Sequence, residues 1–404
     1  MDFETSDRVE ELQAKVDDLI ADVVKPLEEE YAELLGPEQD RVAVDEENRL
    51  VEEWWEISEE IRKESVDRGL YNLVMPKTLG GRDLPWVEFE QVIEHLYNRK
   101  NPGFHKHIIR HDSTPMLLNL PEHLWDDYLH PTMEGELLHC FAMTEPSTGS
   151  SPTWMEATAE KDGDEWVVNG TKRFVTFGPY ADFHIVFART SGEPGDADGI
   201  TAFIVDADQD GIVLEEIERV MGGVPGEHCT FRYDDVRVPA GKTLGEVGDG
   251  LTGGMDWINY GKVYDAGRAL GQAQWALDRS VEYAKERTTW NKPLSDRQAI
   301  RFKLAEMDRK VRRTRWLTRR ACWEMDQNPS GSYAWQARMK IDEAQMLNEV
   351  VDEALQIHGG DGYARKNPIE WLYRHARVYR IWEGADEVMN RTIAKDVVGP
   401  RPED

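Results

Sequence analysis

The chain has 404 residues, with 78 acidic side chains against 48 basic ones and a formal net charge of −30 at pH 7. A chain of this length exceeds what one small hydrophobic core can organise, so we expect two or three domains. The strong negative charge repels phosphate backbones at long range and argues against nucleic-acid binding.

The sequence lacks the features of membrane proteins and of disulfide frameworks. No apolar run approaches the roughly 20 residues that a spanning helix needs, and the N-terminus has no basic and apolar signal region. The three cysteines are isolated and form no C-x-x-C pair, which argues against disulfides and a zinc site. We therefore expect a cytoplasmic protein without a metal, whose cysteines are buried thiols.

The acidity is unevenly distributed and accompanies a shortage of lysine. Arginine outnumbers lysine 31 to 17, a composition expected of proteins kept soluble in concentrated salt. It favours a halophilic source, with an ordinary acidic cytoplasmic protein as the alternative. Residues 1–250 carry 55 acids and 22 bases, whereas residues 251–404 carry 23 acids and 26 bases. The last part of the chain is therefore nearly neutral and better suited to self-association.

Residues 1–137 show helical periodicity. Apolar side chains recur three and four positions apart over 9–35, 52–73 and 86–99, with acidic residues between them. Glycine and proline breakers separate these stretches. We predict an N-terminal α-helical domain.

Residues 138–249 change to short alternating runs separated by turn residues. This pattern is typical of strands that are buried on one face. The dipeptide Asn169-Gly170 lies between two such runs and predicts a hairpin, because both residues tolerate positive φ. We predict a middle β domain, a barrel or a sandwich.

Residues 250–404 return to helical periodicity and predict a C-terminal four-helix bundle. The expected helices cover 267–288, 296–327, 332–360 and 387–398. The fold class is therefore α+β and multidomain, with an α, β, α order.

The stretch 141–153, FAMTEPSTGSSPT, gathers hydroxyl side chains around a proline and a glycine. Its hydroxyls and free backbone N–H groups are able to hold a polar or anionic ligand edge. The alternative is an ordinary turn, which the residues alone favour.

The stretch 169–176 places an aromatic side chain two residues before a threonine. On a strand, Phe174 and Thr176 would share one face and suit a planar heterocycle. Ordinary strand alternation explains the same pattern and is the better interpretation of this stretch alone.

The stretch 356–363 has three glycines in four residues at the end of a long predicted helix. Glycines allow close approach of a ligand, but they serve equally well in a helix C-cap and turn. We interpret His358 as a packed or capping residue rather than as a metal ligand.

Glu383 lies between Trp382 and a glycine, just before the final helix. A carboxylate in an apolar setting is a candidate general base, because loss of water raises its pKa. Alternatively, Glu383, Asp386 and Glu387 only supply acids to a helix N-terminus. The residues alone do not separate these interpretations.

Taken in order, these four segments resemble the acyl-CoA dehydrogenase family, and the α, β, α order is the architecture of that family. The resemblance extends over nearly the whole chain. It implies an enzyme that binds FAD, removes a proton from the α carbon of an acyl-CoA thioester, and passes hydride from the β carbon to flavin N5.

The resemblance implies roles for residues of the middle domain. Met143 and Thr144 would hydrogen-bond the flavin edge, and Ser150 would contact the FAD pyrophosphate. Phe174 would pack on the isoalloxazine and Thr176 would contact flavin N5. The chain departs from the family pattern in having Phe174 for the usual tryptophan and a serine for the usual aspartate after Ser150.

The resemblance also implies a second set of FAD contacts, shared with a neighbouring subunit. Asn291 replaces the glycine that is common in this segment. An FAD site shared between subunits implies a homo-oligomer, usually a tetramer built as a dimer of dimers. The matching residues are Arg287, Thr289, Trp290, Gln298, Gln356 and Gly360.

Glu383 matches the catalytic base of most of the family. Some members place the base on an earlier helix, at the position of Gly261, and glycine has no side chain to serve as one. Lys262, Trp382 and Gly384 match substrate-binding positions. The family pattern Y-E-G-T-x-Q reads W-E-G-A-D-E here, which weakens the FAD contacts expected at its last positions.

The resemblance implies dehydrogenation of a small or medium acyl-CoA to the trans-2-enoyl-CoA in fatty acid metabolism, with an electron-transferring flavoprotein as partner. An acyl-CoA oxidase and an enoyl-CoA reductase are the alternatives, since both use the same flavin and base. A non-enzymatic DNA-binding relative is opposed by the charge of −30 and by the presence of Glu383. The basic stretch 309–320 is interpreted as a solvated face or as inter-subunit ion pairs.

Overall fold

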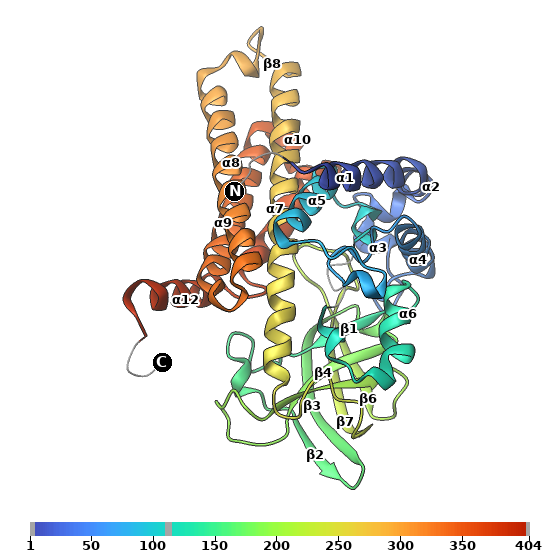
Figure 1. The fold of residues 1–404 in the computed structure, drawn as a ribbon. Coiled ribbons are helices and arrows are strands. Elements are labelled where there is room, and N and C mark those ends of the chain that lie inside the picture. The colour runs from blue at the N-terminus through green and yellow to red at the C-terminus, as the bar shows by residue number, and fades with distance from the viewer. Residues whose placement is uncertain (1–4, 110–114, 401–404) are drawn as a thin grey trace. The chain divides into compact units, whose positions relative to one another are not determined.

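A computed structural model describes residues 5–109 and 115–400 (Figure 1). Contacts along the chain define two compact units. The first, here called the helical unit, comprises Met1–Pro37, Pro76–Ile108 and Gly261–Asp404. The second, here called the sheet unit, comprises Glu38–Met75 and Ile109–Tyr260. The three domains 1–137, 138–249 and 250–404 stay a prediction.

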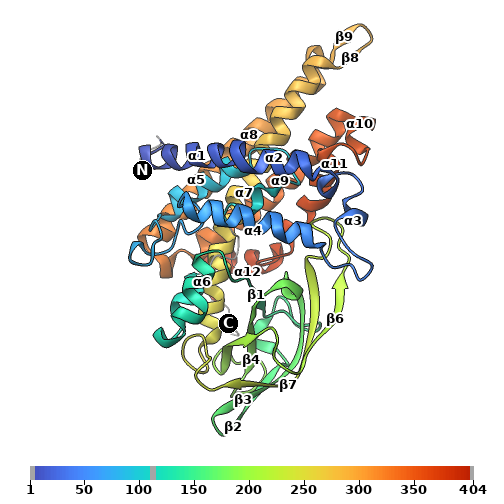
Figure 2. The same ribbon diagram turned by 90° about the vertical axis from the view of Figure 1, so that its right-hand side faces the viewer.

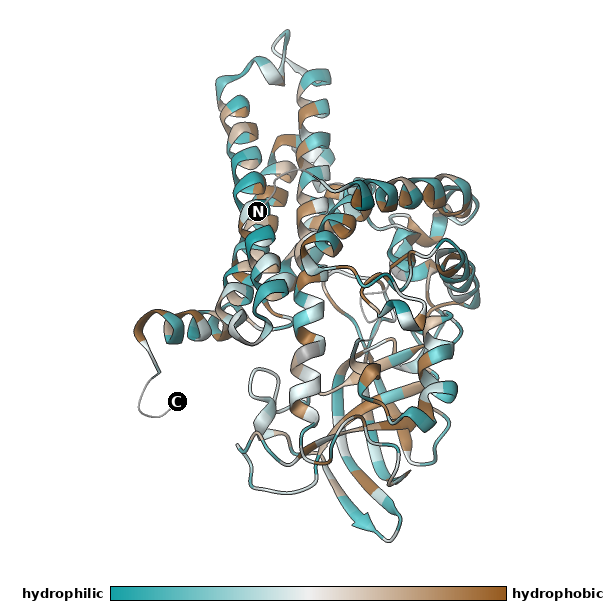
Figure 3. Ribbon diagram, in the orientation of Figure 1, coloured by the Kyte–Doolittle hydropathy of each residue, from teal (hydrophilic) through white to brown (hydrophobic). Residues whose placement is uncertain are grey.

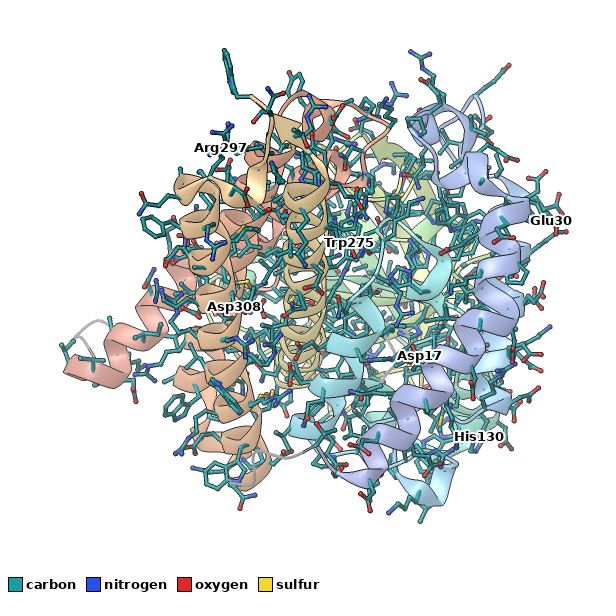
Figure 4. All side chains as sticks on the ribbon, turned by 90° about the horizontal axis from the view of Figure 1, so that it is seen from above. Asp17, Glu30, His130, Trp275, Arg297 and Asp308 are labelled. Atoms are coloured by element: carbon teal, nitrogen blue, oxygen red, sulfur yellow. The ribbon has the colours of Figure 1, made fainter. Side chains whose placement is uncertain are left out.

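The N-terminal helices of the helical unit follow from local signals. α1 (Asp7–Leu19) begins where the Ser6 hydroxyl accepts a hydrogen bond from the backbone N–H of Val9 at 3.3 Å. α1 continues through a π-helical turn, η1 (Ile20–Val24), into α2 (Lys25–Glu30). Figure 3 shows apolar and polar residues alternating along these helices, and Figure 4 shows Glu30 projecting outward from α2. One face is buried and the acidic face is solvated.

The bundle of the helical unit has a continuous apolar core. Its helices are α5 (Trp86–Tyr97), the part of α7 (Gly250–Glu286) from Gly261 on, α8 (Gln298–Gln327), α9 (Tyr333–His358), α10 (Gly360–Tyr363), α11 (Pro368–Ala376) and α12 (Asp386–Val398). Leu270, Val311, Leu347, Val350 and Leu372 belong to its fully buried core. Each such side chain contributes about 1.5–3 kcal/mol by leaving water. The predicted C-terminal helical bundle is confirmed.

All seven basic side chains of the stretch 309–320 on α8 are ion-paired within the chain. The pairs are Arg309–Glu306, Lys310–Glu349, Arg312–Asp308, Arg313–Asp342, Arg315–Glu94, Arg319–Glu94 and Arg320–Glu324. Three of the partners, Glu306, Asp308 and Glu324, lie on α8 itself, and the others lie on α5 and α9, which pack against α8. Arg309, Arg312 and Arg313 are at least half exposed, so the stretch is a solvated face that also forms ion pairs within the helical unit, and pairs between subunits stay a prediction.

The sheet unit contains one curled seven-stranded sheet, which confirms the predicted middle β domain in the form of an open half-barrel. Its strands are β1 (His139–Ala142), β2 (Thr158–Asp162), β3 (Glu165–Thr176), β4 (Phe183–Arg189), β5 (Ile200–Asp206), β6 (Ile212–Glu218) and β7 (His228–Pro239). The strand order is β1-β4-β2-β3-β7-β6, with β5 paired to β4. β4 and β5 are mostly apolar and almost entirely buried, whereas β6 is half-exposed. Helices α3 (Gln39–Val42), α4 (Glu52–Asp67) and α6 (His130–Met133) complete this unit, together with the first turns of α7.

The hairpin predicted at Asn169-Gly170 is wrong. Both residues lie inside β3, and the chain instead reverses between β2 and β3, where Asp162 pairs with Glu165. Gly170 has φ +147°, and a Cβ added to it would lie 2.5 Å from the Cβ of Ala157. The glycine therefore permits a bulge and a close approach of the backbone in the middle of the strand. The same dipeptide is typical of hairpin turns, which explains the wrong prediction.

Short elements connect the helices and strands. In the helical unit they are η2 (Ala32–Leu35), η3 (Lys77–Leu79), η4 (Phe104–His107), β8 (Thr288–Thr289), β9 (Lys292–Pro293), η10 (Leu294–Asp296), η11 (Pro329–Gly331) and η12 (Arg377–Arg380). In the sheet unit they are η5 (Pro115–Asn119), η6 (Glu122–Leu124), η7 (Trp125–Leu129), η8 (Pro152–Trp154) and η9 (Gly178–Tyr180). Figures 1 and 2 show the β8–β9 hairpin at the far end of α7 and α8.

Three absences concern the described part of the chain. None of its helices is long and apolar enough to cross a membrane. The histidines, cysteines and carboxylates of residues 5–109 and 115–400 form no group of three that could hold a metal ion. The thiols of Cys140, Cys229 and Cys322 are buried, as predicted.

Candidate functional site

The loop after β1 in the sheet unit is held by a buried ion pair. Lys172 on β3 is fully buried and donates to the Glu145 carboxylate at 2.7 Å and to the Met143 carbonyl at 3.2 Å. Glu145 also accepts from the backbone N–H groups of Glu156 and Ala157, at 2.6 and 3.0 Å. Burial lowers the pKa of Lys172 to about 8, although Glu145 opposes this shift. The pair joins both ends of the loop to the sheet.

Three of the predicted flavin contacts, Met143, Thr144 and Ser150, lie on this loop. The loop backbone is also tied to β3 by a hydrogen bond from the Arg173 N–H to the Thr144 carbonyl, 2.8 Å. Met143 is buried and Thr144 half-buried, whereas Ser150 is exposed on the loop. Glu145 and Lys172 were not predicted as site residues. Glu145 lies inside the stretch 141–153 that was singled out, whereas nothing in the sequence marks Lys172 as its partner.

Phe174 interrupts β3 and presents its ring to solvent. It has φ +56°, and its side chain is 48% exposed. The strand pairing slips here, so the simple alternation expected between Phe174 and Thr176 does not hold. The Arg173 guanidinium lies 4.8 Å from the ring centroid. An aromatic residue held in the left-handed region and left exposed is typical of a ligand site.

Thr176 ends β3 opposite His228 on β7. The Thr176 hydroxyl and the His228 Nδ1 lie 3.2 Å apart, at hydrogen-bond distance. The Phe174 ring meets the imidazole edge-on, with 6.5 Å between centroids. Phe174 and Thr176 are therefore brought together around His228, which is a further residue at this place on the sheet.

The β8–β9 hairpin presents a group of polar and aromatic side chains in the helical unit. Trp290 and Asn291 form its two-residue turn with φ +50° and +57°, as in a type I′ turn. Trp290 is 92% exposed, and Arg287, just before the hairpin, is exposed as well. Thr289 is half-buried and accepts a hydrogen bond at its carbonyl from Arg297 at 2.6 Å. Gln298 is exposed at the start of α8.

Gln356 and Gly360 lie at the end of α9, and both are exposed. Gly359 ends the helix with φ +57°. His358 is buried, with its Nδ1 2.8 Å from the Ala354 carbonyl, and it stacks on Tyr283 at 4.4 Å. The interpretation of His358 as a packed residue is confirmed.

Glu383 is seated directly against α7. It has φ +50° and precedes α12, which begins at Asp386. A Cβ built on Gly261 would lie 2.7 Å from Cδ of Glu383 and still closer to its Oε1. The side chain of Glu383 therefore occupies the space that any other residue at 261 would need. The two positions at which the resemblance places a base, 383 and 261, are therefore adjacent in space.

Buried charges surround this carboxylate within the helical unit. Lys262 is 5% exposed, and burial lowers its pKa to about 8 although Glu383 opposes this. Lys340 is 3.2 Å from Glu343 and 4.0 Å from Asp265. Burial lowers the pKa of Lys340, but these carboxylates and Glu383 outweigh it and raise the pKa. Burial also raises the pKa of Glu343 well above its usual range.

Trp382 and Gly384 flank Glu383. The Trp382 ring packs on Tyr379 with 5.0 Å between centroids. Gly384 has φ +112°, and a Cβ added there would lie 2.5 Å from Cε of Met389. The local backbone is therefore fixed around Glu383, and the acids of the first turn of α12 are Asp386 and Glu387.

The predicted site residues thus form four groups. Lys262, Trp382, Glu383 and Gly384 lie together around Gly261; Arg287, Thr289, Trp290 and Gln298 lie at the hairpin; Gln356 and Gly360 lie at the end of α9; and Met143, Thr144, Ser150, Phe174 and Thr176 lie on the sheet unit. The donor set fits FAD, because it offers an exposed aromatic ring, hydroxyls and a guanidinium.

Comparison with known proteins identifies the family of the chain. Residues 140–236 match the acyl-CoA dehydrogenase middle domain, and residues 248–398 match its C-terminal domain. A 3-(aryl)acrylate reductase of Clostridium sporogenes is 34% identical over 385 residues, 94% of this chain and 98% of the relative. The caffeyl-CoA reductase-Etf complex subunit CarC of Acetobacterium woodii is 33% identical over 85% of this chain and 91% of its own.

A solved structure supports the same family. Butyryl-CoA dehydrogenase from Megasphaera elsdenii superposes with a TM-score of 0.82 at 27% identity, covering 98% of this chain and 100% of that one. The family models match residues 140–236 and 248–398, and the first relative and the solved structure extend the similarity to 94% and 98% of the chain. The chain belongs to the acyl-CoA dehydrogenase family and is an FAD-dependent oxidoreductase acting on CH–CH groups.

Proposed function

We propose that the protein oxidises an acyl-CoA thioester to the trans-2-enoyl-CoA, with Glu383 as the base that removes the α proton. The observation that carries the proposal is the position of the Glu383 carboxyl against Gly261, among the buried charges of Lys262 and Lys340. An ionisable group in such surroundings is a candidate for acid–base work.

The backbone at Glu383 supports a second role. In the left-handed conformation, φ +50°, its N–H is a candidate donor to the thioester carbonyl, whose oxygen gains negative charge as the α proton leaves. One such donor is worth about 3 kcal/mol where water is excluded. The Trp382 ring, which packs on Tyr379, would help to exclude water.

Residues from three of these groups, those on the sheet unit, at the hairpin and at the end of α9, would hold FAD. Met143, Thr144, Ser150, Phe174 and Thr176 would hold the flavin and its pyrophosphate on the sheet unit. A second set of residues would hold FAD of a neighbouring subunit: the half-buried Thr289 and the exposed Arg287, Trp290, Gln298, Gln356 and Gly360. When bound, FAD supplies the acceptor for the hydride that leaves the β carbon.

The exposure of the hairpin supports a homo-oligomer. An indole that is 92% exposed in one chain indicates a surface that is covered in the assembled protein. We propose a tetramer built as a dimer of dimers, in which each FAD contacts two chains. The relative named as a subunit of a reductase-Etf complex supports an electron-transferring flavoprotein as the redox partner.

Reduction of an enoyl substrate is the second candidate. It is favoured by two relatives named as reductases, at 34% and 33% identity. The same base residue would then donate the α proton rather than accept it. Oxidase activity is the third candidate and would consume oxygen during turnover.

The direction of the reaction is tested by anaerobic mixing. If the proposal holds, acyl-CoAs bleach the oxidised flavin, and the Glu383→Gln variant bleaches it 100-fold more slowly or worse, because a general base contributes about 10²–10⁴-fold. The Glu349→Gln variant, an exposed glutamate on α9, serves as the control and should behave as wild type. A loss below tenfold in Glu383→Gln, with FAD still bound, would reject the base.

The alternatives have their own readouts in the same apparatus. Enoyl-CoA or free arylacrylate that reoxidises the chemically reduced flavin, without bleaching by any acyl-CoA, would favour a reductase. Consumption of oxygen equal to the acyl-CoA oxidised would favour an oxidase.

A further inference from the structure

Arg268 lies in an aromatic enclosure of the helical unit. Its guanidinium carbon is 5.2 Å from the Tyr97 ring, 5.8 Å from the Trp382 ring and 6.0 Å from the Tyr379 ring. Its Nη2 donates to Nε2 of His375 at 2.8 Å. The side chain is only partly buried. Aromatic faces stabilise a cation, but they do not satisfy its N–H groups.

No carboxylate of the described residues lies within ion-pair distance of Arg268. Its Nε is buried and has no hydrogen-bond partner among those residues. Asp265, one turn earlier on α7, is near enough to favour its charge, but Lys340 already engages that carboxylate. Arg315 and Arg319 on α8, by contrast, both contact Glu94. Arg268 is therefore a cation with donor capacity to spare.

Two further sets of polar groups lie beside the same rings. His105 on η4 is 2% exposed, packs edge-on against Tyr97 at 5.2 Å, and its Nε2 has no hydrogen-bond partner in the described chain. The hydroxyls of Tyr97 and Tyr264 lie 2.9 Å apart and share one hydrogen bond. The cations Arg268 and Arg99 add to burial in lowering the pKa of His105 well below its usual value. A group with spare acceptors would complete this cluster.

The cluster lies within reach of the proposed base. Trp382, which faces Arg268, precedes Glu383 in the chain. Gly261, under the Glu383 carboxyl, precedes Arg268 by seven residues, which is two helical turns on the same face of α7 and about 10 Å. Side chains lean toward the N-terminus of a helix, which brings the guanidinium nearer to Glu383. The separation between Arg268 and Glu383 therefore matches that between the reacting α carbon of an acyl chain and a group a few carbons further along the chain.

We propose that Arg268 and His105, enclosed by the Tyr97, Tyr379 and Trp382 rings, form a subsite for an anionic group on the acyl chain of the substrate. The group is a carboxylate or a phosphate, which accepts several N–H donors at once and compensates the guanidinium. The inference rests on the proposed function, since it locates the acyl chain relative to Glu383.

Matched pairs of acyl-CoAs test the subsite in the FAD-loaded enzyme. Succinyl-, glutaryl- and adipyl-CoA carry a terminal carboxylate, and butyryl-, pentanoyl- and hexanoyl-CoA have the same chain lengths without it. 5-Phosphonopentanoyl-CoA tests a phosphate-like group in place of a carboxylate. Dissociation constants are measured from the shift of the flavin absorption spectrum on binding, and rates from anaerobic bleaching.

We expect one anionic member to bind about 10- to 100-fold more tightly than its neutral partner, the range of one or two charge-assisted hydrogen bonds. Arg268→Met should remove this preference and leave the neutral affinity within threefold, whereas Arg268→Lys should keep part of it. FAD content and thermal unfolding show whether each variant folds, and the preference of the wild type tests the subsite without any variant.

The outcomes separate the subsite from the function. If neutral acyl-CoAs bleach the flavin and no anionic partner is preferred at any length, the subsite is refuted and the function stands. A wild-type preference that persists in Arg268→Met refutes the role of Arg268. If no acyl-CoA of either kind bleaches the flavin, the proposed function fails; the subsite then stands if an anionic acyl-CoA still binds at least tenfold more tightly than its neutral partner, and it is refuted if none does.

Discussion

Replacing Gly261 with alanine moves the proposed base without removing it. The new methyl carbon would lie 2.7 Å from Cδ of Glu383, whereas ordinary van der Waals contact begins at 3.4 Å, so the carboxyl must shift by at least 0.7 Å. A misplacement of about 1 Å in an active site costs about 100-fold in rate. We therefore expect the rate of flavin bleaching by acyl-CoA to fall by 10- to 100-fold.

The stability of the Gly261→Ala variant should stay the same or rise, although its rate falls. The atoms in the way belong to the end of a flexible side chain, and alanine is favoured over glycine inside a helix by about 1 kcal/mol. The Gly261→Ala variant should thus unfold at the same or a higher urea concentration than wild type. Gly253→Ala on the same helix is the matched control, because its nearest neighbour would be 3.7 Å away. The control should show the gain in stability without the loss of rate.

The reasoning is refuted if Gly261→Ala bleaches within threefold of the wild-type rate. It is also refuted if the substitution slows the Glu383→Gln variant as much as it slows wild type, since the effect is expected to pass through the Glu383 carboxyl. Stopped-flow absorbance under anaerobic conditions gives all four rates of this double-mutant cycle.

Three further changes follow from buried or exposed groups. Burial raises the pKa of Glu90 to about 8, so the native state keeps a proton that the unfolded chain loses above its ordinary pKa of 4.5. The free energy of unfolding should therefore fall as the pH rises from 4.5 toward 8, and Glu90→Gln should reduce this fall. Urea unfolding of both proteins at pH 5.5 and 8 measures it, and an equal fall in wild type and variant would contradict the reasoning. Lys172→Met leaves the Glu145 carboxylate buried without its cation and should cost about 3–5 kcal/mol of unfolding free energy, with loss of FAD; a cost below 1 kcal/mol would contradict this. Trp290→Ala should change the unfolding free energy by less than about 0.5 kcal/mol yet lower the FAD content of the purified protein, and full FAD content would argue against the hairpin as a cofactor contact.

Local signals account for the parts of the fold that the sequence predicted. The apolar spacing of Val9, Leu12 and Val16 marks the buried face of α1, and Ser6 caps it, so the helix is legible from adjacent residues. The reversal assigned to Asn169-Gly170 failed for the opposite reason. A glycine is needed at 170 because Ala157 packs against it, and Ala157 lies beside it only when the sheet has formed.

Only those candidate site residues that belong to a motif could be predicted from the sequence. The resemblance singled out Glu383 and the proposed flavin-contact segments, because their order along the chain is specific. Lys172, Glu145 and Arg268 were not predicted as site residues. Charged side chains are expected at the surface, and nothing near these three in the sequence indicates that they are buried or partly buried. The ion pair of Arg315 on α8 with Glu94 on α5 could not be predicted either, because the two residues are far apart in the sequence.

Exchange of the α protons tests the central claim most directly, because it reports the action of the base apart from hydride transfer. The FAD-loaded enzyme is incubated anaerobically in D₂O with an acyl-CoA that it binds, and deuterium at the α carbon is followed by mass spectrometry. The account predicts deuterium uptake in wild type and a fall of 100-fold or more in Glu383→Gln, with Glu349→Gln unchanged. Uptake at the wild-type rate in Glu383→Gln would show that another group removes the proton.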